Sequence, residues 1–120
     1  MTKSVLLPFP PKELNPNARI HWAKKSKIAK KYRNDCCLLC KQAGLNVDDL
    51  DVLHVFITFY PPNARSRDDD NLIAAFKNAR DGIADAIGVD DKHFKTHPLL
   101  SDKVVKGGAV EVIFSSEYTK

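Results

Sequence analysis

Residues 52–60 read VLHVFITFY and stop at Pro61-Pro62, and this run predicts one central strand around which the other elements can be arranged. β-Branched and aromatic residues favour a strand, and proline cannot continue its hydrogen-bond ladder. Side chains alternate between the two faces of a strand, so one face carries Leu53, Val55, Ile57 and Phe59. The other face mixes polar and apolar side chains, and we expect it to be half covered.

One helix is predicted before this strand in the sequence and a second helix after it. From about His21 to Ala43, apolar residues recur with a period near 3.6, at Trp22, Ile28, Tyr32, Cys36, Leu39 and Cys40. A second helix is expected from about Asp70 to Ile87, with a core stripe of Leu72, Phe76, Ala79, Ile83 and Ile87. Gly44 and Gly88 are placed to end the two helices.

Shorter extended segments complete the pattern. Residues 3–7 predict a strand that ends at Pro8, and residues 89–91 a short extended piece. Residues 104–114 predict a hairpin whose second strand is Val110 to Phe114. The order β-α-β-α-β-β predicts an α+β fold, in which a small mixed sheet of about four strands is packed by two helices. The 120 residues are expected to form a single domain, residues 1–120.

Length and composition exclude several classes of protein. The chain is too short for a doubly wound dinucleotide-binding fold or a TIM barrel. No apolar run approaches the roughly 18–20 residues of a membrane span, and Pro8 comes too early for a secretory signal. We therefore expect a cytoplasmic protein that does not associate with a membrane.

The three cysteines, Cys36, Cys37 and Cys40, all lie in the first predicted helix. An odd, clustered set makes a poor disulfide framework and indicates a reducing compartment. A zinc site would need a fourth ligand. We expect these thiols to be buried and unreactive.

The net charge of +4 is distributed unevenly. Residues 1–47 hold ten Lys and Arg against two acidic residues, whereas residues 48–91 hold ten Asp against four basic residues. A basic third joined to an aspartate-rich third indicates a polyanionic partner and a place for a divalent metal. A solvated surface on each part is the alternative interpretation.

The most informative stretch is Arg65-Ser66-Arg67-Asp68-Asp69-Asp70-Asn71-Leu72. Three consecutive carboxylates repel one another, and Mg²⁺, which prefers carboxylate oxygens, would relieve that repulsion. If extended backbone continues to Asp70, alternation puts Asp68 and Asp70 on one side and Asp69 on the other. The EF-hand, HExxH and Walker A patterns do not occur in the sequence.

In the second predicted helix, Asp70, Ala74, Lys77 and Asp81 fall on one stripe roughly opposite the core. Lys77 could stabilise negative charge that develops on a phosphate. Lys77 and Asp81 could equally form an ordinary i,i+4 surface pair. Spacing alone leaves both interpretations open.

These residues belong to a wider pattern that resembles the RusA-type endodeoxyribonucleases, resolvases of Holliday junctions found in phages and prophages. The resemblance covers nearly the whole chain. It comprises Leu7-Pro8-Phe9-Pro10-Pro11, an asparagine-rich loop before a basic helix, Arg67-Asp68-Asp69-Asp70-Asn71-Leu72, Asp90-Asp91 after a glycine, and Lys106-Gly107-Gly108.

The resemblance implies a Mg²⁺-dependent endonuclease, with Mn²⁺ as a substitute metal, that cuts four-way DNA junctions in recombination and repair. The family's metal-binding and catalytic positions correspond here to Asp68, Asp70 and Asp91. Known members carry a functional lysine where this chain has Ala74, and Lys77 is the nearest substitute for that catalytic role.

The partners implied are branched DNA and a second copy of the chain, because a twofold homodimer places one active site at each of two symmetric strands. We expect DNA contacts from basic and amide residues, namely Asn17, Arg19, Lys24, Lys25, Lys27, Lys30, Lys31, Arg33, Arg65 and Arg67. Two alternatives are a non-catalytic DNA-structure-binding protein of a phage or prophage, and an interaction protein whose acidic segment pairs with a basic helix.

Overall fold

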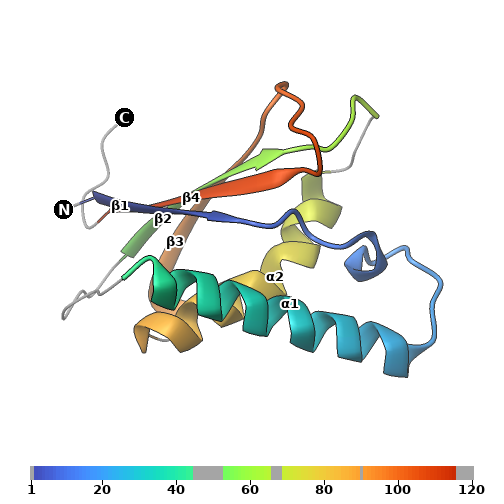
Figure 1. Ribbon diagram of the computed structural model, residues 1–120, viewed down its shortest axis with the longest axis horizontal. Coiled ribbons are helices and arrows are strands. Elements are labelled where there is room, and N and C mark those ends of the chain that lie inside the picture. Colours follow the sequence, from blue (N-terminus) through green and yellow to red (C-terminus); the bar gives the residue numbers. More distant parts are fainter. Residues whose placement is uncertain (1, 45–52, 66–68, 90, 116–120) are drawn as a thin grey trace.

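A four-stranded mixed sheet carries two helices on one of its faces in the computed structural model, which describes residues 2–44, 53–65, 69–89 and 91–115 (Figure 1). The predicted α+β fold is therefore confirmed. The elements are β1 (Thr2–Leu7), η1 (Lys12–Leu14), α1 (Trp22–Gln42), β2 (Leu53–Tyr60), α2 (Asp69–Ile87), η2 (Asp91–His93), β3 (Phe94–Leu100) and β4 (Ala109–Ser115).

The strand order in the sheet is β1-β4-β2-β3. β4 pairs antiparallel with both β1 and β2, whereas β3 runs parallel to β2 and begins where Phe94 pairs with Leu53. α2 connects these two parallel strands, so it must run back along the sheet from the end of β2 to the start of β3.

The predicted hairpin over residues 104–114 is wrong. β4 pairs with β1 and β2. The strand before it is β3, which was not predicted from sequence and which pairs with β2 alone. Its sequence, FKTHPLL, lacks a clear apolar alternation. β3 forms an edge of the sheet, a position where Pro98 is tolerated because one side of the strand needs no partner. The expected extended piece at residues 89–91 is also wrong at Asp91, which begins η2.

The core lies between the helices and the sheet face that carries Val55, Ile57 and Phe59, each at most 3% exposed. The expected helix stripes are confirmed at the buried residues Tyr32, Cys36, Cys40, Leu72, Phe76, Ala79 and Ile83. Burial of one Val, Leu, Ile or Phe side chain contributes about 1.5–3 kcal/mol, so this layer holds the helices on the sheet. The opposite side chains of β2 are half-buried, as predicted.

Trp22 departs from the predicted apolar face, since it is 76% exposed and stacks on His21 instead. It is the first residue of α1. At 1.5 Å per residue it lies about 16 Å before Arg33, where α1 packs against α2.

The prediction of buried cysteines is confirmed at Cys36 and Cys40, both 0% exposed and free of disulfides. Burial raises the pKa of each of these thiols to about 12, and neighbouring ionisable groups add to that effect. Cys37 differs because it is only half-buried. Among the helices of the described segments, none is long and apolar enough to cross a membrane.

Candidate functional site

Asp70 lies exposed in the first turn of α2, just after the loop that follows β2. A helix N-terminus favours a carboxylate because its backbone N–H groups point toward that charge. Asp68 and Arg67 lie outside the described residues, as does the side chain of Asp69. Asp70 is therefore the one carboxylate of the acidic run that the structure places.

Asp91 is not brought to Asp70 within one chain. Asp70 is the second of the 19 residues of α2, and Asp91 lies past the other end of that helix, directly before β3. A helix rises 1.5 Å per residue, so the two backbones lie roughly 25 Å apart along its axis. The parallel pairing of β2 and β3 requires this separation, because α2 must traverse the sheet between them.

The described residues contain no group of three or more His, Cys, Asp and Glu side chains that could hold a metal ion. The described side chains exclude those of Asp68, Asp69 and Asp91. Of the three predicted metal ligands, the structure therefore describes the side chain of Asp70 alone.

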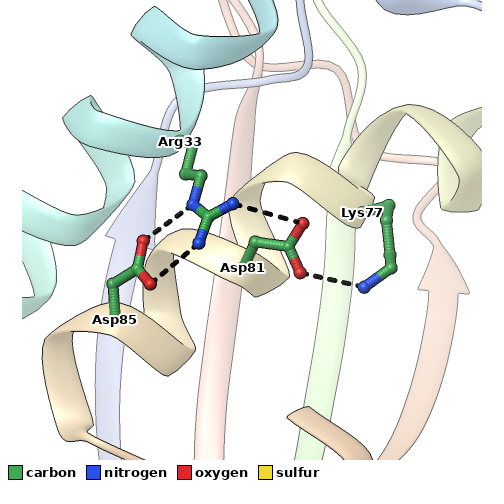
Figure 2. A network of polar contacts seen from close by, with 4 residues as sticks. All are labelled: Arg33, Lys77, Asp81 and Asp85. Atoms are coloured by element: carbon green, nitrogen blue, oxygen red, sulfur yellow. Dashed lines mark hydrogen bonds and ion pairs between the residues drawn. The ribbon is translucent and has the colours of Figure 1, made fainter. Parts of the chain in front are cut away.

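Lys77 forms the i,i+4 pair that was one of its two interpretations, with Nζ 2.9 Å from Oδ1 of Asp81 (Figure 2). Oδ2 of Asp81 lies 4.0 Å from Arg33 of α1, and Arg33 donates from Nε and Nη2 to Asp85 at 2.7 and 2.9 Å. Arg33, expected to contact phosphate, therefore links the two helices. Its hydrogen bond and charge hold the pKa of Asp85 below its usual range.

Apart from Arg65 and Arg67, the other cations expected to contact DNA lie in and before α1. Lys24, Lys27 and Lys30 are exposed, as are Asn17 and Arg19 in the preceding loop. Two lysines are engaged within the protein. Lys25 donates to the carbonyl of Asn15 at 3.2 Å, and Lys31 pairs with Asp35 at 2.7 Å.

A cavity of about 580 Å³ lies beside the first turn of α2. Its polar lining residues are Lys12, Asn15, Asn63, Arg65 and Asn71. Arg65 was predicted from sequence as a DNA contact, whereas no role was predicted for Lys12, Asn15 or Asn63. Residues 8–17 and 61–63 are rich in proline and asparagine, which favour loops. This composition was the sequence signal for the two loops that line the cavity.

No protein-family model matches the chain. Over 113 residues it is 45% identical to an uncharacterized protein of Xylella fastidiosa (strain Temecula1), across 92% of this chain and 74% of that protein. The chain belongs to the family of that Xylella protein. The sequence similarity to that protein extends over nearly the whole chain.

Among solved structures, the chain is similar to one described as "IspF (Plasmodium falciparum) CDP complex", with 12% identity and a TM-score of 0.29. The match covers 77% of this chain and 54% of that chain, so this protein spans about half the length of the solved structure. A TM-score of this size does not indicate a shared fold.

Proposed function

We propose that the protein is a Mg²⁺-dependent endodeoxyribonuclease that resolves four-way Holliday junctions by paired nicks in DNA recombination and repair. The observation that carries this proposal is the position of Asp70, exposed at the N-terminus of α2 beside a cavity lined by Lys12 and Arg65. A metal-dependent nuclease needs carboxylates for the ion and cations for the phosphate in one place. The resemblance to RusA-type resolvases supports the same activity.

Asp68 and Asp70 would hold the metal, with Mn²⁺ as a substitute. Bound Mg²⁺ would supply charge neutralisation at the phosphate and a more acidic water. Asp91 lies far from Asp70 within one chain, so in this proposal it would serve the site of a second copy. A twofold homodimer that presents the partner subunit's Asp91 to each site would have two sites, one for each strand to be cut.

The exposed lysines of α1 would position the DNA by contacts to backbone phosphates, which carry no sequence information. Lys77 remains a candidate for stabilising charge at the phosphate. Its side chain is 53% exposed, so a phosphate could compete with Asp81 for the ammonium group.

A non-catalytic DNA-structure-binding protein is the second candidate. The distance between Asp70 and Asp91 favours it, because a monomer then lacks the carboxylate set that the resemblance implies. Both candidates share the DNA-binding surface and differ only in cleavage.

Incubation with a fixed four-way junction and with a linear duplex of matched sequence tests the proposal, each in Mg²⁺ and in EDTA. We expect paired nicks in opposing strands of the junction in Mg²⁺ alone, with the duplex intact. Tight junction binding without nicks in Mg²⁺ or Mn²⁺ would establish the non-catalytic candidate instead. Equal, weak binding to both DNAs would contradict both candidates.

A further inference from the structure

The cavity beside α2 combines cationic, amide and aromatic groups in one place. At about 580 Å³ it falls within the roughly 300–1,000 Å³ of small-molecule sites. The loop after β1, the loop after β2, the first turns of α2 and Gly107 before β4 line it, and the buried residues Leu72 and Ala75 contribute apolar surface. This mixed lining suits a small ligand that carries both charged and apolar groups.

The charge of the lining favours an anion. Lys12 and Arg65 are exposed cations at the cavity, and no Asp or Glu is found among the described residues that line it. A guanidinium group and an ammonium group both bind phosphate oxygens by charge-assisted hydrogen bonds.

Two of the lining asparagines are held in place by hydrogen bonds to their own loops. Oδ1 of Asn15 accepts from the backbone N–H of Asn17 at 2.8 Å, and Oδ1 of Asn63 accepts from that of Arg65 at 3.1 Å. Each bond orients the carboxamide oxygen of one asparagine that lines the cavity. A fixed carboxamide is suited to hydrogen-bond the edge of a nucleobase, as asparagine does with adenine.

The aromatic group of the cavity is Phe9, whose ring meets Phe59 edge to face with centroids 6.3 Å apart. Gly108 allows this placement, because a Cβ there would lie only 2.7 Å from the Cβ of Phe9. Aromatic rings bind unstacked bases by stacking, and this contact does not occur with phosphate or sugar alone.

We infer that this cavity is a subsite for one unstacked nucleotide of DNA, with the phosphate at Lys12 and Arg65 and the base between Phe9 and the asparagines. This inference rests on the proposed function, because it assumes that the partner is DNA. It adds that a structure-selective enzyme reads a base next to the cut, since base extrusion is easiest where a duplex is already interrupted.

Titration of the ¹⁵N-labelled protein in EDTA tests this subsite without metal or cleavage. The probes are the four 2′-deoxynucleoside 5′-monophosphates, deoxyribose 5-phosphate and inorganic phosphate. We expect at least one nucleotide to shift the amide resonances of Phe9, Asn15 and Asn63 and to bind roughly tenfold more tightly than deoxyribose 5-phosphate. Equal affinity for the nucleotides and the sugar phosphate, or no shift at these residues, would overturn the inference.

The double variant Asn15→Ser/Asn63→Ser removes both carboxamides, while each hydroxyl can still accept the turn hydrogen bond. Nucleotide binding should fall about tenfold, and binding of inorganic phosphate should not change. Asn34→Ser on the exposed face of α1 is the matched control and should bind like the wild type. Unchanged nucleotide binding by the double variant would contradict the assignment.

The outcomes separate this subsite from the proposed function. Nucleotide binding at the cavity together with an inert junction would leave the subsite standing and refute the nuclease. Junction cleavage with an identical choice of cut site in the wild type and the double variant would do the reverse.

Discussion

Gly82 of α2 lies directly against the backbone of Arg33 in α1. A Cβ at residue 82 would overlap the carbonyl oxygen of Arg33 and lie 3.2 Å from the backbone nitrogen of Cys37. The two helices therefore meet backbone to backbone at this point. The same contact brings the side chain of Arg33 to Asp81 and Asp85, which lie on either side of Gly82 in sequence (Figure 2).

Gly82→Ala should destabilise the protein by about 1–3 kcal/mol, because the helices would have to separate. Alanine is intrinsically the better helix former by about 1 kcal/mol, so the sign of the change is informative. Urea unfolding followed by circular dichroism measures it. Asn34→Ala, at an exposed position of α1, is the control and should stay within about 0.5 kcal/mol. A stabilised Gly82→Ala protein would contradict the close helix contact.

Cysteine reactivity should follow burial. Burial raises the pKa of Cys36 and Cys40 to about 12, and only thiolates react with alkylating reagents. We expect iodoacetamide at pH 8 to label Cys37 first in the folded protein, and all three cysteines in 6 M guanidinium chloride. Peptide mass spectrometry distinguishes the sites. Rapid labelling of Cys36 or Cys40 in the folded state would show that α1 is not packed as described.

The ion pair between Arg33 and Asp85 should contribute to stability in a pH-dependent way. Because the pKa of Asp85 is lowered in the folded state, its contribution is present above its ordinary pKa near 4 and is lost as the pH falls through the lower, folded value. Asp85→Asn should therefore lower the Tm at pH 7 and change it little near pH 2. Asp102→Asn, in an exposed loop, is the control and should be neutral at pH 7. An equal loss at both pH values would exclude the charge as the cause.

Junction affinity should fall steeply with salt through the exposed lysines of α1. Replacing Lys24, Lys27 and Lys30 by Gln should flatten the plot of log affinity against log salt by about one unit for each lost phosphate contact. Lys95→Gln, on the edge strand β3, provides a cation outside that helix and should leave the slope unchanged. If the triple variant keeps the wild-type slope, the DNA binds elsewhere.

Much of the fold was predictable from sequence because its main elements have strong local signals. The apolar periodicity of α2 and the β-branched run of β2 place both to within a residue or two. β3 was not predictable because an edge strand needs only one partner and tolerates a polar, proline-containing sequence. The strand β2, with which β3 pairs, also lies next to β4 in the sheet, although β2 and β4 are far apart in the sequence. Local sequence patterns cannot reveal such a pairing.

The candidate site was predictable only in part. Asp70 could be chosen as a candidate because a run of carboxylates is costly without a cation. Its distance from Asp91 could not, because it depends on the parallel crossover through α2. Asn15 and Asn63 line one cavity from loops almost 50 residues apart, and the sequence pattern does not reveal that the two loops meet.

Whether Asp70 binds the catalytic metal is decided by comparing the wild type with Asp70→Asn on a four-way junction in Mg²⁺, with cleavage read on a denaturing gel and binding read in Ca²⁺. Asp102→Asn controls for the loss of one negative charge elsewhere. We expect paired nicks by the wild type and by Asp102→Asn. Cleavage by Asp70→Asn should fall roughly 10²-fold or more, with junction binding equal or tighter because a charge facing phosphate is gone. Cleavage by Asp70→Asn at close to the wild-type rate would show that Asp70 is not a ligand of the catalytic metal.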